Sequence, residues 1–375
     1  MTVSDSTAQL SDSTARPQSV SHRVPYSLTR AGTLMRPDPQ NPDEAEGVLN
    51  PGSGWGPDGK LYLLPRLVSA GNISRVGLAA IRIAGGKPVG VDREGVVLAP
   101  DAGWEHSPLH AGVEDPRITW IPTLDVFVMT YVAYGPLGPR PALATSVDLR
   151  SWRRLGPVHF EYQPDLDMDL NLVPNKDVVF FPEPVPGPDG EMCFAALHRP
   201  MWDLDWIVPG AGDHLPGWLT DDRPGIWISY IPAALVRADI SALVHFRRHT
   251  LVAMPEFDFE ALKIGAGPPP TRVEEGWLLI HHGVSGTIVP GVDQQQAARY
   301  AAGAMILSAD DPSKVLARTP IPLLEPATDA ETEGIVPNVV FPTAIEMIDG
   351  QRFVFYGMAD SQIGIATLDR IEDPS

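Results

Sequence analysis

The sequence predicts an all-β protein with the architecture of a five-bladed β-propeller and an active-site pocket at its centre. The chain of 375 residues contains 34 glycines and 40 prolines, and so many turn formers favour short elements over long helices. Helical periodicity is weak; the segment 232–249 shows some but fits a pair of strands equally well. One pattern, a Gly- or Asp-containing turn and two strand-like runs, recurs five times. Five antiparallel units indicate a propeller, with a two-sheet sandwich as the alternative.

The five repeats are rich in aromatic and β-branched residues and are bounded by Gly, Pro and Asp, as strands are. Their first runs begin at Gly59, Leu124, Gly190, Glu275 and Gly350, and their second runs begin at Ser74, Pro141, Gly225, Tyr300 and Ile363. We expect residues 31–375 to form a single propeller domain. Residues 1–30 are expected to be a disordered tail, because the beginning of the chain is rich in Ser and Thr and poor in aromatic residues.

A polar segment that contains proline precedes each repeat. In a propeller the equivalent strand of every blade lines the central channel, so these segments should converge on one axial pocket. They are LNPGSG from Leu49, GVEDPR from Gly112, NKDVVFFPE from Asn175, KIGAGPPP from Lys263 and VPNVVFPT from Val336.

Composition narrows the range of partners. The net charge of −19 argues against nucleic acid and anionic membranes, and an anionic substrate would need a local cluster of cations. No apolar run suggests a signal peptide or a membrane span. Cys193 is the only cysteine and fits a small buried hydrophobic residue. We expect a reduced, cytoplasmic protein with no metal and no organic cofactor, whose oligomeric state the sequence does not define.

Several motifs, in order, resemble glycoside hydrolase family 130, the β-mannoside phosphorylases and related β-mannosidases. The resemblance covers about residues 50–366 and implies a five-bladed propeller. It is carried by GVEDPR at Gly112–Arg117, NKDVVFFPE at Asn175–Glu183, LHRP at Leu197–Pro200, KIGAGPPP at Lys263–Pro270, EEGWLLIHHGV at Glu274–Val284 and EGIVPNVVFPT at Glu333–Thr343.

The resemblance implies that Asp115 is the general acid, which delivers its proton through a sugar hydroxyl. The alternative is that Asp115 only caps a turn before Pro116, a common role of Asp-Pro. The adjacent Glu114 should point to the opposite face of an extended segment, which makes a structural role the better interpretation.

Phosphate needs cations and hydrogen-bond donors, and a phosphorylase needs only one carboxylic acid because phosphate is itself the nucleophile. The candidates are Arg75, Arg140, Lys176, His282 and Tyr300. Each alone could be an ordinary surface or strand residue. Their positions on different predicted blades are what suggests a shared site. Tyr300 precedes Ala301, where relatives commonly carry Arg, and this departure weakens the argument for phosphate.

The resemblance assigns mannose binding to Asn175, His198, Arg199 and Asp360. Asp360 is also the second carboxylate that a hydrolase could use as a base, or it could be a hairpin turn residue. The insertion at residues 201–219 carries several tryptophans and could line the acceptor side, although core packing explains Trp227 equally well.

The leading functional hypothesis is inverting phosphorolysis of a β-mannoside, with phosphate as co-substrate and α-mannose 1-phosphate as product. An inverting β-mannosidase that uses water is the first alternative, and a non-catalytic sugar-binding propeller is the second. The sequence leaves the linkage, β-1,2 or β-1,4, and the acceptor sugar open, because acceptor selection depends on loops. The hypothesis requires Asp115 to lie near Arg75, Lys176 and His282.

Overall fold

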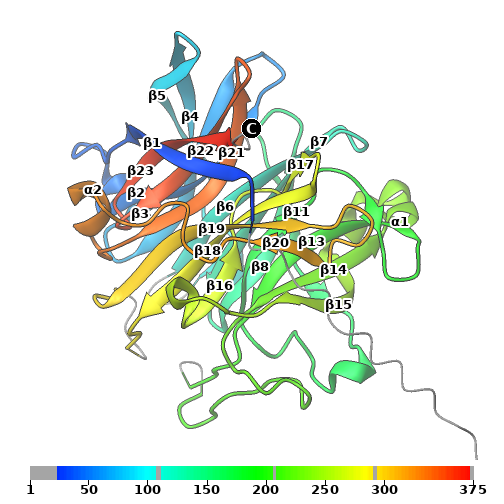
Figure 1. Ribbon diagram of the computed structural model, residues 1–375. Coiled ribbons are helices and arrows are strands. Elements are labelled where there is room, and N and C mark those ends of the chain that lie inside the picture. Colours follow the sequence, from blue (N-terminus) through cyan, green and yellow to red (C-terminus); the bar gives the residue numbers. More distant parts are fainter. Residues whose placement is uncertain (1–22, 107–110, 206–207, 290–293, 372–375) are drawn as a thin grey trace, which may run out of the picture.

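The computed structural model describes residues 23–106, 111–205, 208–289 and 294–371. Their strands form five antiparallel four-stranded units arranged around a common centre (Figure 1). A short parallel contact between Ser74 and Gly112 joins the first unit to the second. The prediction of an all-β five-bladed propeller is therefore confirmed.

The strands follow the chain from blade to blade. Blade 1 consists of β2 (Gly47–Trp55), β3 (Leu61–Ser69), β4 (Ile73–Ala84) and β5 (Lys87–Leu98), and blade 2 of β6 (Ala111–Ile121), β7 (Val126–Gly135), β8 (Gly138–Ser146) and β9 (Arg153–Pro157). Blade 3 consists of β11 (Asn175–Phe180), β13 (Met192–Pro200), β14 (Ile226–Pro232) and β15 (His245–Ala253), with β10 (His159–Phe160) beside β15 and β12 (Val185–Pro186) beside β13. Blade 4 consists of β16 (Lys263–Ala266), β18 (Gly276–Gly286), β19 (Ala298–Leu307) and β20 (Val315–Arg318), with β17 (Thr271–Val273) beside β18.

The amino-terminal strand closes the ring. Blade 5 consists of β21 (Val340–Ile348), β22 (Gln351–Met358) and β23 (Gln362–Arg370), and its outer strand is β1 (Tyr26–Met35). β1 pairs antiparallel with β23 from Tyr26 opposite Arg370 to Met35 opposite Ile363, so the two ends of the colour scale lie side by side in Figure 1. The predicted tail boundary at residue 30 is therefore too late, because residues 26–30 pair in the sheet. Residues 1–22 lie outside the described part.

Helices are few and short in the described ranges. They are α1 (Ala233–Ala238), α2 (Asp329–Thr332) and 3-10 turns at Pro42–Glu44, Gly103–Glu105, Pro164–Leu166, Ile240–Val244 and Asp258–Glu260. The ambiguous segment 232–249 thus forms α1, a 3-10 turn and the beginning of β15. No helix of the described ranges has the length and apolar character that a membrane crossing requires.

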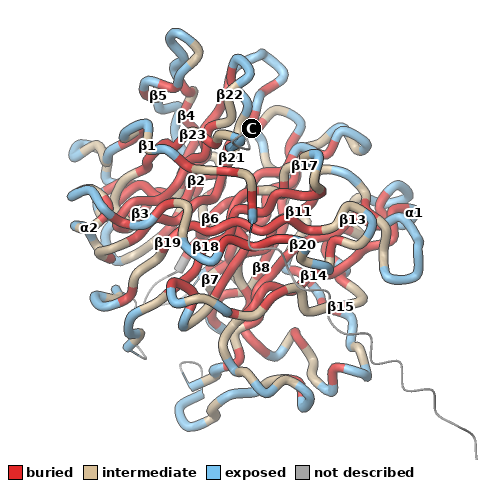
Figure 2. Tube along the Cα trace, viewed as in Figure 1, coloured by how far each residue is buried: buried red, intermediate tan, exposed pale blue. Residues whose placement is uncertain are grey.

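Each pair of neighbouring blades shares its own hydrophobic cluster. One cluster includes Leu64 and Val76 of blade 1 with Met129 of blade 2, and another joins blade 5 to blade 1 and includes Phe355 and Leu63. Equivalent clusters lie between blades 2 and 3, 3 and 4, and 4 and 5. A two-sheet sandwich would bury one core between its sheets, whereas here apolar side chains fill both faces of every blade. Figure 2 shows the buried strands at the centre and exposed loops around them.

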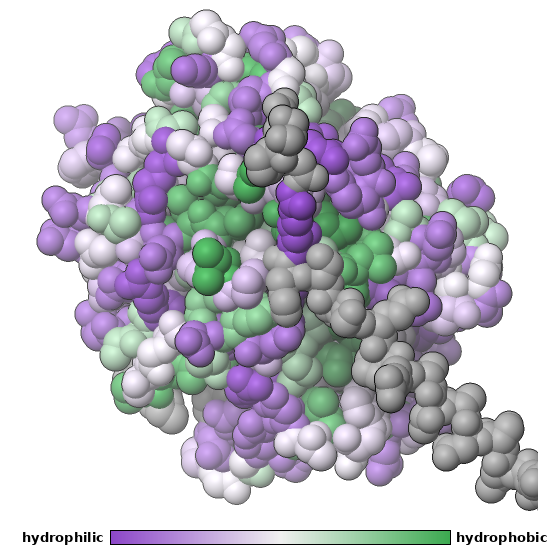
Figure 3. All heavy atoms as spheres, in the orientation of Figure 1, coloured by the Kyte–Doolittle hydropathy of each residue, from purple (hydrophilic) through white to green (hydrophobic). Residues whose placement is uncertain are grey.

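Polar residues dominate the loops and outer edges of the face seen in Figure 3, with apolar residues between them. The predicted repeats are the two middle strands of each blade, for example β3 with β4 and β22 with β23. The polar segments before them coincide with the innermost strands β2, β6, β11, β16 and β21. This placement brings residues that are far apart in the sequence to one centre.

Candidate active site

Asp115 is buried within β6, the innermost strand of blade 2. Its Oδ1 accepts a hydrogen bond of 2.9 Å from Asn50 Nδ2 and one of 3.1 Å from Arg66 Nη1. Burial alone would raise the pKa of this carboxyl, but the charges of Arg66 and Lys176 and the hydrogen bond from Asn50 outweigh it and hold the pKa below its usual value. In the absence of ligand Asp115 is therefore a carboxylate.

Glu114 faces the same cation as Asp115, contrary to the expectation of opposite faces. Its Oε1 lies 2.9 Å from Arg66 Nη2, and its Oε2 lies 3.3 Å from Lys176 Nζ. The strict alternation of a strand fails here because Asp115 has a φ of 50° and the β6–β7 register shifts between Glu114 and Arg117. A bulge thus turns two consecutive carboxylates toward Arg66.

A second carboxylate, Asp177, gathers cations in the same central region. Its Oδ1 lies 3.0 Å from Arg117 Nη2, and its Oδ2 lies 2.6 Å from Arg199 Nε. His282 Nε2 is 3.6 Å from the same Oδ2. Burial opposes ionisation of Asp177, but Arg199, His282 and Arg117 hold its pKa well below its usual value. Lys176, the neighbour of Asp177 on β11, links this cluster to Glu114.

Lys263 completes the cationic cluster from blade 4. Lys263, Val284 and Tyr300 lie in one cross-strand row, and Lys263 Nζ lies 5.7 Å from the centre of the Tyr300 ring. Burial, and then the charges of Arg199 and Lys176, lower the pKa of Lys263 to about 7, against the attraction of Asp177. Lys263 therefore lies among other cations of the site and is only partly charged at neutral pH.

Several buried polar atoms here have no hydrogen-bond partner among the described residues. They are Asn50 Oδ1, Asn175 Oδ1, Arg199 Nη1 and both ring nitrogens of His282. Buried polar groups are almost always hydrogen-bonded in folded proteins. Burial keeps the pKa of His282 well below its usual value, so its neutral ring has one donor and one acceptor to offer. Together these donors and acceptors form a candidate site for a polar ligand.

Asp360 reaches this region from the turn between β22 and β23. It has a φ of 49°, which agrees with a hairpin turn residue, but it is also electrostatically coupled to the centre. Burial, and then the negative charges of Asp115 and Glu114, raise its pKa to about 6, although Arg66 and Lys176 oppose the shift. Asp115 and Asp360 thus form a pair of carboxyls with pKa values displaced in opposite directions.

Two predicted phosphate ligands, Arg75 and Arg140, are not joined to this cluster by any contact of the described residues. Arg75 lies opposite Leu67, whereas Arg66 lies opposite Val76, so Arg75 and Arg66 leave blade 1 on opposite faces. The Arg75 guanidinium binds Ser69 and Asp43 instead. The requirement that Asp115 lie beside Arg75 is thus not met, and Arg66 supplies the cation in its place.

Arg140 lies on β8 in a row with Ala133 and Val113. That face packs into the core shared with blade 1. Burial lowers the pKa of Arg140, and its Nη1 has no partner among the described residues. Tyr134 lies in the row next to that of Arg140. Lys176 Nζ lies 5.6 Å from the centre of the Tyr134 ring.

His198 does not offer a free nitrogen to a sugar. Its Nδ1 lies 3.0 Å from Asn175 Nδ2, and its Nε2 lies 2.8 Å from Ser229 Oγ. The predicted direct contact of His198 with mannose is therefore replaced by a position behind Asn175.

The insertion at residues 201–219 leaves β13 at Pro200, directly opposite Asn175, and so begins at the end of the blade where the site lies. Trp202 and Trp227 are buried with ring centres 5.9 Å apart, which supports core packing for both. Trp218 is half-exposed.

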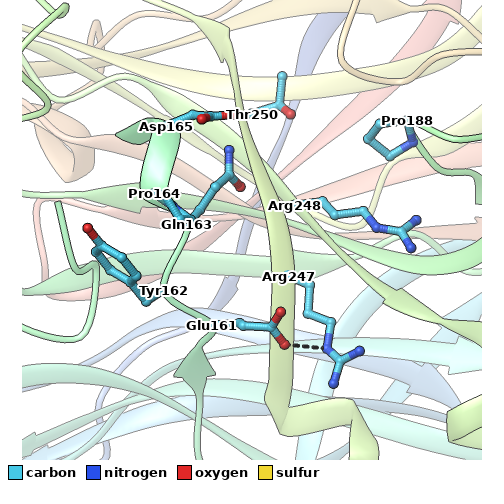
Figure 4. Close-up of a pocket in the computed structure, with 9 residues that line it drawn as sticks. All are labelled: Glu161, Tyr162, Gln163, Pro164, Asp165, Pro188, Arg247, Arg248 and Thr250. Carbon is cyan, nitrogen blue, oxygen red and sulfur yellow. Dashed lines mark ion pairs between the residues drawn. The ribbon is translucent and has the colours of Figure 1, made fainter. Parts of the chain in front are cut away.

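A separate cavity of about 460 Å³ lies at β15 and is lined by the residues labelled in Figure 4, including Arg247 and Arg248.

Arg66, Asn50, Lys263, Asp177 and Arg117 were absent from the predicted site. The sequence does contain a pattern that could have identified Arg66, because this residue is the only charge within the apolar run YLLPRLV. Asn50 and Lys263 lie in the polar segments that were expected to line the channel, and only their individual roles were missed.

Gly265 allows Asp177 and His282 to approach β16 closely. A Cβ at this position would meet Asp177 Oδ2 at 2.2 Å and His282 Cε1 at 2.5 Å. We expect Gly265→Ala to lower the free energy of unfolding by about 1–3 kcal/mol, measured by denaturant unfolding. Gly217→Ala is the matched control, because a Cβ there meets nothing within 4 Å. Equal effects of the two changes would contradict the role given to Gly265.

Comparison with known proteins identifies the family. A family model described as beta-1,4-mannooligosaccharide phosphorylase matches residues 230–373. A 1,2-beta-oligomannan phosphorylase from a Thermoanaerobacter species is 33% identical over 261 residues, which are 69% of this chain and 68% of that protein. A beta-1,4-mannooligosaccharide phosphorylase from Ruminococcus albus is 35% identical over 133 residues, which are 34% of this chain and 38% of that protein.

The fold agrees with a solved structure. The beta-1,2-mannobiose phosphorylase from Listeria innocua, in complex with beta-1,2-mannobiose, superposes with a TM-score of 0.63 at 23% identity, covering 92% of this chain and 97% of that one. This chain belongs to glycoside hydrolase family 130, the family of mannoside phosphorylases.

Proposed function

We propose that this protein catalyses inverting phosphorolysis of a β-mannoside to α-mannose 1-phosphate and a shortened acceptor. The observation that carries the proposal is the buried carboxyl of Asp115 beside a cluster of cations with unpartnered donors. The curated relatives described above are phosphorylases of β-1,2- and β-1,4-linked mannosides, and we leave both linkages open for this chain. A cytoplasmic location is part of the proposal, because a sugar phosphate retained in the cell conserves the energy of the bond.

In the proposed reaction a phosphate oxygen attacks the anomeric carbon on the face opposite the acceptor. The bond from that carbon to the glycosidic oxygen breaks, and the oxygen takes the electron pair and a proton that originates from Asp115. Lys176, Lys263, Arg199 and His282 bind the phosphate, and Tyr300 lies beside them. Asn175, Arg199 and Asp360 contact the mannosyl unit.

Asp115 must be protonated before it can donate, yet the free site favours its carboxylate. Phosphate bound next to Lys176 would offset part of the positive charge that lowers the pKa of Asp115. The mannosyl unit would displace water from the same carboxyl. Both effects favour the protonated form, so binding of the co-substrates prepares the acid.

The direct test is product formation from a panel of β-1,2- and β-1,4-linked manno-disaccharides, with and without phosphate. Release of α-mannose 1-phosphate, seen by phosphorus NMR, is expected only with phosphate. Equal turnover in both buffers would overturn the proposal and favour the β-mannosidase alternative. Asp360 would be its base, since a pKa of about 6 leaves that carboxyl largely ionised at neutral pH.

Lys263 gives the anion site a testable pH dependence. Because its pKa is about 7 in the free site and a bound anion favours the ammonium, binding above that pH must recruit a proton. We use sulfate as the probe, whose charge is constant over this range, and expect its competitive inhibition against phosphate to weaken as the pH rises through about 7. In Lys263→Met, inhibition should be weaker and nearly independent of pH.

Lys87→Met is the control, because Lys87 is exposed on β5. Sulfate should inhibit Lys87→Met as strongly as it inhibits the unchanged protein at every pH. A steep pH dependence that persists in Lys263→Met would show that another group controls anion binding.

A further inference from the structure

A chain of buried polar groups runs from the active site to the outer edge of blade 3. Asn175 Nδ2 lies 3.0 Å from His198 Nδ1, and His198 Nε2 lies 2.8 Å from Ser229 Oγ. Ser229 Oγ lies 2.8 Å from His249 Nδ1, and His249 Nε2 lies 2.9 Å from the Glu161 carbonyl oxygen. The four side chains are at most 3% exposed. The proposed reaction uses only the first of them.

The last group of the chain fixes the direction of every hydrogen bond in it. A backbone carbonyl only accepts, so His249 must donate to Glu161 from Nε2. A neutral His249 then has an acceptor at Nδ1, to which the Ser229 hydroxyl donates its one proton. Ser229 must in turn accept from Nε2–H of His198.

The same logic fixes the amide at the inner end. His198, protonated on Nε2, has an acceptor at Nδ1, so the group that faces it must be the NH₂ of Asn175. Asn175 Oδ1 is thereby turned away from the chain. That oxygen is one of the buried atoms without a partner among the described residues.

The surroundings support neutral and immobile rings. Burial lowers the pKa of His249 and holds that of His198 well below its usual value. The Phe160 ring packs on both imidazoles at 5.0 and 5.5 Å. The backbone at the outer end is also held in place. The Glu161 backbone N–H donates to the Phe246 carbonyl oxygen, and the His249 backbone N–H donates to Gln163 Oε1. Glu161 and Gln163 line the cavity in Figure 4.

We propose that His198, Ser229 and His249 form a one-directional hydrogen-bond relay, anchored at the Glu161 carbonyl, that presents Asn175 Oδ1 to the substrate as an acceptor. An acceptor oxygen cannot hydrogen-bond a phosphate oxygen that carries no proton, whereas it can receive a sugar hydroxyl. Asn175 is thus assigned to a hydroxyl of the mannosyl unit. This last step rests on the proposed function, and the relay itself does not.

The relay is tested without any turnover by the ring nitrogens of the two histidines. In ¹⁵N-histidine-labelled protein at neutral pH, both His198 and His249 should show the neutral form protonated on Nε2. His249→Phe keeps an aromatic ring beside Phe160 but frees Ser229 to donate the other way, so His198 should become a mixture of tautomers. A charged ring, or protonation on Nδ1 in the unchanged protein, would overturn the relay even if the variant failed to fold.

His245→Phe is the matched control, because His245 is exposed on the same strand and outside the relay. It should leave the tautomer of His198 unchanged. A change of equal size in both variants would mean that the relay does not set the tautomer.

The assignment of Asn175 is tested by binding. In His249→Phe, the affinity for α-mannose 1-phosphate or mannose, measured by calorimetry, should fall about fivefold, as expected for one neutral hydrogen bond. Inhibition by sulfate should not change. A monodeoxy mannose that lacks the contacted hydroxyl should bind both proteins equally. Loss of sulfate binding with unchanged sugar binding would overturn the assignment, and absence of phosphorolysis alone would count only against the proposed function.

Discussion

Replacing Asp115 by Asn is expected to lower the kcat of phosphorolysis by about a thousandfold, the size of a general-acid contribution. The amide keeps the volume of the carboxyl but cannot give up a proton to the leaving oxygen. Asn tolerates the left-handed backbone, with a φ of 50°, that residue 115 adopts. The fold should therefore persist, as measured by circular dichroism and thermal unfolding.

Asp125→Asn is a matched control for this change. Asp125 has a φ of 53° but lies in the turn between β6 and β7, outside the site. The Asp125→Asn variant should retain full activity. A nitrophenyl β-mannoside, whose leaving group needs little protonation, should lose much less rate in Asp115→Asn than a manno-disaccharide does. Equal losses on both substrates would indicate that Asp115 is not the acid.

Replacing Arg66 by Gln is expected to destabilise the protein by about 3 kcal/mol near neutral pH, because it leaves Asp115 and Glu114 buried without their shared cation. The Arg66 side chain is only 12% exposed. Phosphorolysis should also be largely lost, since Asp115 loses a group that orients it. Denaturant unfolding and initial rates measure the two effects.

The loss of stability should depend on pH. Arg66 helps hold the pKa of Asp115 low, so in the intact protein its stabilising contribution is present at neutral pH and is lost as the pH falls through the acidic range. Without Arg66, burial raises that pKa, and the carboxyl is neutralised at a higher pH. The difference in stability between the two proteins should therefore shrink toward about pH 4.

Arg82→Gln provides the contrast, because Arg82 pairs with Asp92 at 2.6 Å while both side chains are more than half exposed. Exposed ion pairs contribute little to stability, so its effect should be below about 1 kcal/mol. The double change Arg66→Gln with Glu114→Gln should recover part of the stability but not the activity. A double variant less stable than Arg66→Gln would contradict this assignment of charge.

Much of the architecture was predictable from local patterns. The five repeated hairpins became the middle strands of five blades, because alternating apolar runs bounded by turn residues specify strand pairs without long-range information. Closure of the ring was not predictable, since the pairing of β1 with β23 joins residues at opposite ends of the chain, from Tyr26 opposite Arg370 to Met35 opposite Ile363. The early part of the chain was therefore assigned to a tail up to residue 30.

Within the site, the sequence alone determined residues in family-like motifs: Asp115, Asn175 and Lys176 on innermost strands, and Arg199 and His282 on the strands next to them. Tertiary structure decided which side chains meet. It placed Arg66 rather than Arg75 beside Asp115, turned Glu114 inward at a bulge, and put His198 behind Asn175. The physical reason is that motifs report residue type and order along one strand, whereas register, bulges and the stacking of blades set the direction of each side chain, and those depend on partners elsewhere in the chain.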